Sequence, residues 1–161
     1  QGLSDKEALS TDPDDDTWWE KVQDLELNHR HLRKLSNLER LVNLKVLSVC
    51  DNEILGIQGL EKCVHLEELL MEENRVTKIE NLAALVNLKK LDLGKNKISR
   101  IENLENLTNL VQLSLEDNEV ENLSGLNKLS TLLELYLGNN KIGDMREVLQ
   151  LKPLPKLIIL D

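Results

Sequence analysis

Leucine and other aliphatic residues recur along this chain at a fixed interval of 22 residues. The interval separates five leucines that begin successive copies of one pattern: Leu44, Leu66, Leu88, Leu110 and Leu132. The copy that begins at Leu88 reads L-x-x-L-x-L-x-x-N-x-I-x-x-I-x-x-L-x-x-L, and its neighbours keep mostly aliphatic residues at the apolar positions. This period predicts a stack of equivalent coils, because one such coil cannot bury its apolar side alone.

Each copy contains two spacings, which predict two kinds of backbone. Leu91 and Leu93 alternate with polar residues, as in a short strand whose leucines point inward and whose intervening residues point outward. The later spacing of three predicts tight turns of the 3₁₀ type rather than a full α-helix, because about ten residues must descend and return within one coil. We therefore expect a curved parallel sheet with short turns on its outer side.

An asparagine recurs where each predicted strand ends. The five copies are Asn52, Asn74, Asn96, Asn118 and Asn140. We expect the side-chain amide to pair with backbone groups that the bend would otherwise leave without a hydrogen bond.

Residues 1–21 carry no repeat and form a predicted acidic N-terminal capping segment. Asp12–Pro13 fits the N-cap and first position of a helix, so we expect a short capping helix over residues 13–21. Trp19 occupies an apolar position of the repeat register, which predicts that its indole covers the first coil. Trp18 is either a second buried ring or an exposed contact.

Residues 22–161 form the predicted repeat domain, with six full coils and the start of a seventh. The first coil, residues 22–43, is degenerate, as terminal repeats usually are. Pro153 and Pro155 predict a changed turn in the sixth coil, and residues 157–161 begin a strand that stops mid-pattern. We expect the chain to be an excerpt of a longer protein, and we expect this excerpt to self-associate through the uncovered edge.

The 22-residue pattern, with Ile-Glu-Asn-Leu segments at residues 79–82 and 101–104, resembles one class of leucine-rich-repeat proteins. That class includes a regulatory subunit of protein phosphatase 1, the spliceosomal A-prime protein and an axonemal dynein light chain. The resemblance covers residues 22–161 and implies an α/β repeat solenoid, a right-handed coil with a concave parallel β-sheet and short 3₁₀ or helical turns on the convex side. The class shares its architecture and little of its function.

Composition limits the setting in which the protein acts. The chain is 40% apolar and 30% charged and has no Phe, which predicts a soluble domain with an aliphatic core. No stretch approaches the roughly eighteen apolar residues of a membrane span, and no signal peptide is evident. We expect an intracellular, cytoplasmic protein that contacts no membrane, with ciliary, centrosomal and nuclear locations left open. Cys50 and Cys63 should lie too far apart to form a disulfide, which fits a reducing compartment.

The sequence contains no motif for catalysis or for a cofactor. It lacks a phosphate-binding glycine loop, a paired-cysteine metal pattern and a nucleophile motif, so we predict neither an enzyme nor a bound cofactor. His29 and His31, with Asp24 and Glu26 nearby, could be imagined as a metal site. Histidines two apart on a loop are usually solvated, and without a third fixed ligand we predict no metal. Cys50 has an acidic neighbour, which disfavours its thiolate.

The repeat register identifies the side chains that face outward from the strands, on the predicted concave surface. These positions hold ten acids and two lysines, a charge of −8, whereas the whole chain carries −9. A surface that serves only solubility would interleave both signs. Apolar residues among the carboxylates indicate the centre of an interface. The predicted partner-binding residues are Val46, Glu68, Leu70, Glu72, Glu73, Asp92, Glu116, Glu134 and Tyr136.

These patterns predict a protein–protein interaction module, either a scaffold or a regulatory subunit. Its acidic concave face would receive a basic helix or loop of a partner, since the field speeds encounter and the apolar patch holds the complex. The same charge disfavours nucleic acid as a partner.

Two alternatives remain open from the sequence. The domain could be a structural spacer or dimerisation element of a larger ciliary or centrosomal protein, with no ligand on its concave face. The resemblance also implies a phosphatase-1 regulator, whose concave strands are rich in acidic and aromatic residues, or a spliceosomal assembly role. In this chain Tyr136 is the one aromatic residue on the predicted face.

Overall fold

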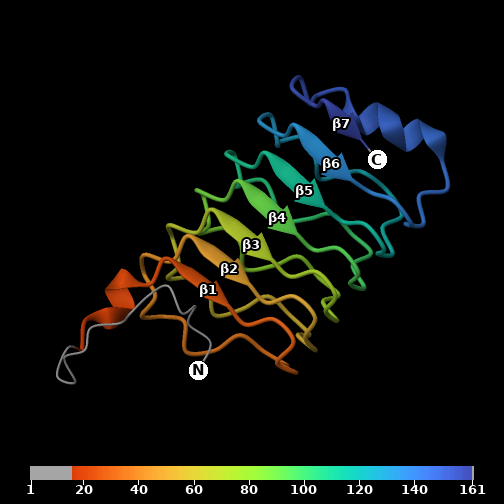
Figure 1. The fold of residues 1–161 in the computed structure, drawn as a ribbon. Coiled ribbons are helices and arrows are strands. Elements are labelled where there is room, and N and C mark those ends of the chain that lie inside the picture. Colours follow the sequence, from red (N-terminus) through yellow and green to blue (C-terminus); the bar gives the residue numbers. More distant parts are fainter. Residues whose placement is uncertain (1–15, 161) are drawn as a thin grey trace.

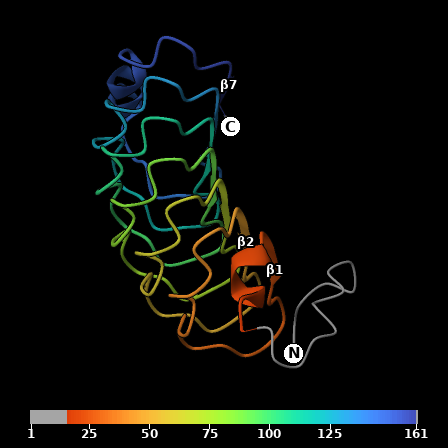
Figure 2. The same cartoon turned by 90° about the vertical axis from the view of Figure 1, so that its left-hand side faces the viewer.

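The chain folds into a stack of coils built on one parallel sheet (Figure 1). A computed structural model describes residues 16–160. Within these residues seven strands lie side by side in chain order: β1 (Asp24–Glu26), β2 (Val46–Ser48), β3 (Glu68–Leu70), β4 (Lys90–Asp92), β5 (Gln112–Ser114), β6 (Glu134–Tyr136) and β7 (Ile159–Leu160). Seen from the side, the strands run along one side of the stack and the returning turns along the other (Figure 2). The predicted solenoid is confirmed.

The core consists of the leucines that the repeat pattern points inward. The central residue of each three-residue strand is buried and its neighbours face outward, except that Ser114 is also buried. Leu91 and Leu93 are both completely buried, as the alternation predicts. One continuous apolar cluster extends from Val22 in the first coil to Leu154 near the C-terminal end. Stacking thus buries what a single coil would expose.

The convex side of each coil is made of tandem tight turns. The amide of Leu85 donates to the carbonyl of Leu82 at 2.9 Å, and that of Leu88 donates to the carbonyl of Leu85 at 3.0 Å. These bonds span three residues, which is the 3₁₀ spacing that the sequence predicts. The leucines at this interval therefore point to the same side of the turn, into the core.

The recurring asparagines form a ladder of side-chain hydrogen bonds along the bend after each strand. The Asn96 amide nitrogen donates to the carbonyls of Leu93 and Met71, each at 3.0 Å. Its amide oxygen accepts a hydrogen bond from the backbone amide of Val76 at 2.9 Å. Asn74 and Asn118 make equivalent bonds. One side chain therefore ties its own coil to the preceding one, as predicted.

The N-terminal helix is shorter than predicted. In the described part it is a four-residue 3₁₀ helix, η1 (Trp18–Lys21), and the side chain of Thr17 makes no capping hydrogen bond. Residues 1–15, which include the predicted N-cap, lie outside the described residues. The rings of Trp18 and Trp19 stack with centroids 3.5 Å apart, and both pack against the core. The guanidinium of Arg40 lies 5.0 Å from the centre of the Trp19 ring.

The sixth coil departs from the regular pattern, as predicted, but ahead of its two prolines rather than at them. Around Pro153 and Pro155 the regular tandem turns remain, since the amide of Leu154 donates to the carbonyl of Leu151 at 3.0 Å and that of Leu157 to the carbonyl of Leu154 at 3.4 Å. A 3₁₀ helix, η2 (Met145–Leu151), begins after Asp144, whose side chain accepts a hydrogen bond from the amide of Arg146. This helix leads into β7, which pairs with β6. No other strand among residues 16–160 pairs with β7, so its outer edge is open there. No helix in the same range has the length and hydrophobicity needed to cross a membrane.

Candidate functional site: the concave face of the sheet

Two rows of outward side chains run across the strands at right angles to them. The first row contains the first residue of each full strand: Asp24, Val46, Glu68, Lys90, Gln112 and Glu134. The second row contains the last residue of each full strand: Glu26, Ser48, Leu70, Asp92, Ser114 and Tyr136. Parallel pairing aligns each residue with its counterpart 22 positions further on, so the sequence register is also the spatial register.

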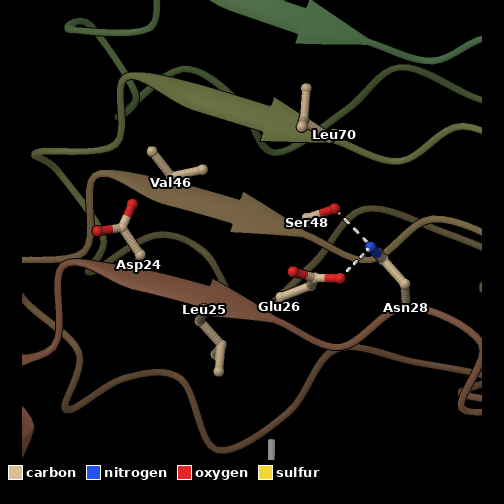
Figure 3. A pocket seen from close by; sticks show the side chains of 7 residues that line it. All are labelled: Asp24, Leu25, Glu26, Asn28, Val46, Ser48 and Leu70. Atoms are coloured by element: carbon tan, nitrogen blue, oxygen red, sulfur yellow. Dashed lines mark hydrogen bonds between the residues drawn. The ribbon is translucent and has the colours of Figure 1, made fainter. Parts of the chain in front are cut away.

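The N-terminal end of these rows contains a shallow hollow of about 330 Å³. Its lining consists of Asp24, Leu25, Glu26, Asn28, Val46, Ser48 and Leu70. Figure 3 shows Val46 and Leu70 rising from β2 and β3, while Asp24 and Glu26 project from β1 beside them. The hollow therefore joins apolar side chains with carboxylates. It brings together Val46 and Leu70, the two predicted aliphatic contacts.

At the edge of this hollow, Asn28 forms hydrogen bonds with the two neighbouring side chains of the second row, Glu26 and Ser48 (Figure 3). Its amide nitrogen donates to Glu26 Oε1 at 3.0 Å, and its amide oxygen accepts from Ser48 Oγ at 2.9 Å and from the Cys50 backbone amide at 2.7 Å. Glu26 is thereby held in place with its second oxygen unused among the described residues. Asn28, Ser48, Glu26 and Asp24 were absent from the predicted contacts, although the repeat register already places them on this surface.

Several carboxylates of the concave face have no cationic partner. Among residues 16–160, no ion pair is made by Asp24, Glu26, Glu68, Asp92, Glu116 or Glu134. Lys90, in the first row, is also without an ion pair in the described part of the chain. The unpaired acids outnumber this lysine, so the shared surface has a negative potential that attracts cationic groups.

Other acids near the strand ends are already paired across coils. Lys95 Nζ lies 2.8 Å from Glu72 Oε1 and 3.9 Å from Glu73 Oε2. The hydrogen bond that Lys95 donates to Glu72 raises the pKa of Lys95, with the charges of Glu72 and Glu73 adding to the effect. His29 Nδ1 likewise lies 2.5 Å from Asp51 Oδ2. The predicted contacts Glu72 and Glu73 thus share their charge with a lysine of this chain.

The remaining predicted contacts lie on the C-terminal half of the face. Asp92 accepts a hydrogen bond from the Gly94 amide at 3.0 Å, and Tyr136 donates one to Glu134 Oε2 at 3.1 Å. Ser114, which pairs in register with both Asp92 and Tyr136, is buried. Glu116 lies beyond the end of β5 and is half-buried.

The imagined metal residues do not gather around one point. His29 is paired with Asp51, and His31 Nδ1 lies 3.4 Å from Glu53 Oε1. In the described part of the chain no group of three or more His, Cys, Asp or Glu side chains is arranged to hold a metal ion.

Both cysteines are free thiols, in agreement with the sequence register. Cys50 is half-buried at the end of β2, and burial raises the pKa of its thiol despite a weak hydrogen bond with Ser48. Cys63 lies in the core, where burial raises its pKa as well. A raised pKa keeps Cys50 largely protonated at neutral pH, as predicted.

Comparison with known proteins identifies the repeat. Residues 64–106 and 86–128 match the sequence family described as leucine rich repeats (2 copies). The structure is similar to an internalin (inlF) of Listeria monocytogenes, with a TM-score of 0.78 and 26% identity over 89% of this chain and 48% of that one. Internalin C2 of the same organism gives a TM-score of 0.66 and 29% identity over 88% of this chain and 71% of that one.

A leucine-rich-repeat protein of Leptospira interrogans is also similar, with a TM-score of 0.76 and 32% identity over 84% of this chain and 37% of that one. The chain thus spans less than half of the inlF and Leptospira proteins. A search among curated protein sequences gave no match. The matched segments, the regular 22-residue register and the structural neighbours agree. Residues 64–128 are therefore leucine-rich repeats, and the fold of the chain is that of a leucine-rich-repeat solenoid.

Proposed function

We propose that this protein is an interaction module that binds a basic segment of a partner protein on its concave face. The observation that carries the proposal is the hollow between β1 and β3, where the aliphatic side chains of Val46 and Leu70 lie among unpaired carboxylates. Apolar residues surrounded by polar ones are typical of interface centres. The carboxylates add a long-range attraction that accelerates encounter with a cationic surface.

The charge distribution supports a basic partner over a solubilising role. Cross-coil pairs such as Lys89–Glu67, at 2.7 Å, neutralise acids elsewhere on the surface, whereas Asp24 and Glu68 have no such pair among the described residues. A surface that only kept the protein in solution would gain nothing from grouping its unpaired acids around aliphatic side chains. Nucleic acid is a poor candidate for the direct partner, because phosphates carry the same sign.

The proposal is tested by capturing binding proteins with three versions of the domain. These are wild type, Val46→Arg with Leu70→Arg, and a control, Leu55→Arg, at an aliphatic residue that is 61% exposed outside the two rows. We expect the partner to bind wild type and the control but not the double variant, provided that circular dichroism shows all three folded. A partner that binds all three equally would exclude the concave face as its site.

The captured partner then provides a second test, which concerns the electrostatic attraction in the proposal. Its association rate with wild type should fall steeply as ionic strength rises to the physiological range, because exposed charges are screened over about 8–10 Å. An association rate that is independent of salt would contradict steering by the acidic face.

A structural spacer or dimerisation element is the second candidate. It is favoured by apolar side chains exposed near the open edge of β7, where Ile158 is 77% and Leu160 47% exposed. A phosphatase-regulator role has less support, since Tyr136 is the one aromatic side chain in the two rows. Ciliary, centrosomal and spliceosomal roles rest on the sequence resemblance alone.

A further inference from the structure

The first row across β1, β2 and β3 alternates in chemical character. Asp24, Val46 and Glu68 are aligned by parallel pairing, so an aliphatic side chain stands between two carboxylates. Neither carboxylate makes an ion pair within residues 16–160. Along the strands the order differs, because β1 presents only acids outward and β2 presents Val46 followed by Ser48. The pattern of charge, apolar residue and charge therefore runs across the sheet.

The spacing of this row follows from sheet geometry. Neighbouring strands lie about 4.8 Å apart, so the two carboxylates are separated by roughly 10 Å with the aliphatic residue midway. A ligand that satisfies all three side chains must present two cations about 10 Å apart and an apolar side chain between them on the same face.

An α-helix meets this requirement and an extended chain does not. Residues i and i+7 of a helix face the same side about 10.5 Å apart, and i+3 or i+4 lies near the midpoint. Same-side residues of an extended strand recur at about 7 and 14 Å, so no pair of them matches the separation of roughly 10 Å between the two carboxylates. From this geometry we infer that the partner segment is an amphipathic helix lying across β1–β3, with basic residues at i and i+7 and an aliphatic residue at i+3 or i+4.

In this arrangement each feature of the hollow has a counterpart. The two basic residues contact Asp24, which lines the hollow, and Glu68, which follows Val46 in the first row outside it; the aliphatic residue packs on Val46 with Leu70 beside it. Glu26, which Asn28 holds in place, adds a third carboxylate at the edge near the first basic residue. This inference rests on the proposed function, because it specifies the shape and residue spacing of the basic segment that binds the same face.

Designed peptides test the inference without knowledge of the natural partner. Three fluorescent peptides of about 18 residues carry the same number of lysines and leucines, and in two of them a staple on the outer face maintains the helix, which would be marginal at this length. The first has lysines at i and i+7 with leucine at i+3. The second moves the lysines to i and i+4, and the third is unstapled and carries a central proline that prevents helix formation. Fluorescence anisotropy measures their affinity for the domain.

We expect the i, i+7 helix to bind about fivefold more tightly than either other peptide, since each of the others loses at least one of the two exposed ion pairs. The variant Asp24→Asn with Glu68→Gln should abolish this preference. The control variant Glu102→Gln with Glu105→Gln changes the net charge equally, outside the two rows, and should retain it.

Two results would overturn the inference. Equal affinity for all three peptides would exclude the helical register, and absence of binding by every peptide would do the same. The proposed function fails by a different criterion, namely a captured natural partner that binds the Val46→Arg, Leu70→Arg variant as tightly as wild type.

Discussion

The backbone of Gly125 lies directly against the carbonyl oxygen of Ile101 in the preceding coil. A Cβ atom on Gly125 would lie 2.1 Å from that oxygen, and the residue has a φ of 100°. Asn81 and Asn103 occupy the same repeat position with φ near 60° and donate side-chain hydrogen bonds to the carbonyls of Ile57 and Ile79. The position therefore requires a residue that adopts the left-handed backbone conformation. The residue must also either lack a Cβ, as glycine does, or donate a side-chain hydrogen bond to the preceding coil, as asparagine does.

Gly125→Ala should lower the free energy of unfolding by at least about 2 kcal/mol, because it combines a strained φ with a backbone clash. Gly125→Asn should cost less, since asparagine tolerates this conformation and can bond to Ile101 as Asn103 bonds to Ile79. Gly143→Ala is the control, because a Cβ there meets nothing within 4 Å. Urea titration measures all three. Equal stability of the Ala and Asn variants would contradict the bonding argument.

Leu93 tests the core of the most regular coil. The side chain is completely buried between matched coils, so Leu93→Ala should cost about 2–5 kcal/mol through a cavity that the stack cannot close. The same change at Leu55, which is 61% exposed, should cost less than about 0.5 kcal/mol. Denaturant unfolding of the two variants gives the comparison, and similar losses would mean that the strand packing is not as described.

The asparagine ladder should contribute more to the free energy of unfolding than the surface area that it buries suggests. Asn96→Ala removes bonds to Leu93, Met71 and Val76 and leaves buried backbone groups unpaired, which should cost about 2–4 kcal/mol. Asn127→Ala, at an exposed turn position, is the matched control and should be nearly neutral. Thermal unfolding monitored by circular dichroism distinguishes the two. A nearly neutral Asn96→Ala would show that the ladder is dispensable.

Much of this structure follows from the repeat alone. A fixed period of 22 residues places each leucine and each ladder asparagine in the same environment, so strands, core and outward rows could be read from Leu88 and its counterparts. The site was predicted less completely. Val46 and Leu70 were expected on the face, but the hollow also depends on Asp24, Glu26 and Asn28. These three residues belong to the first coil, whose sequence departs from the repeat and therefore gives a weaker signal.

The repeat pattern could not predict which side chains of different coils contact each other. Lys95 reaches back to Glu72, because a long side chain can pair with any of several neighbours in space. The N-terminal helix was overestimated. Among the described residues it covers only Trp18–Lys21, where the rings of Trp18 and Trp19 stack and pack against the core, whereas the local capping signals lie further upstream in the sequence.

Cys50 provides a pH-dependent probe of the concave face. Burial raises the pKa of its thiol above the ordinary value, so alkylation by iodoacetamide should be slow at neutral pH and accelerate in the alkaline range. Cys63 is buried in the core and should react only on unfolding. Mass spectrometry of peptides after timed labelling measures each site, and Cys50→Ser removes the fast phase. Rapid labelling of Cys50 below pH 7 would contradict the raised pKa.

The open edge of β7 should make the chain self-associate. The strand pairs only with β6 among the described residues, and Ile158 and Leu160 expose apolar surface beside its unpaired backbone groups. An uncovered strand edge with exposed aliphatic side chains favours pairing with another chain. Sedimentation velocity should therefore show the mass of wild type rising with concentration, whereas Ile158→Lys with Leu160→Lys should remain monomeric, because charge at an edge disfavours pairing. Leu55→Lys adds charge at an exposed leucine outside this edge and should associate as wild type does.

In hydrogen exchange at low concentration, the amides of β7 should be less protected than those of β4, which is paired on both sides. A wild-type chain that stays monomeric at high concentration, with β7 as protected as β4, would rule out this edge as an association site.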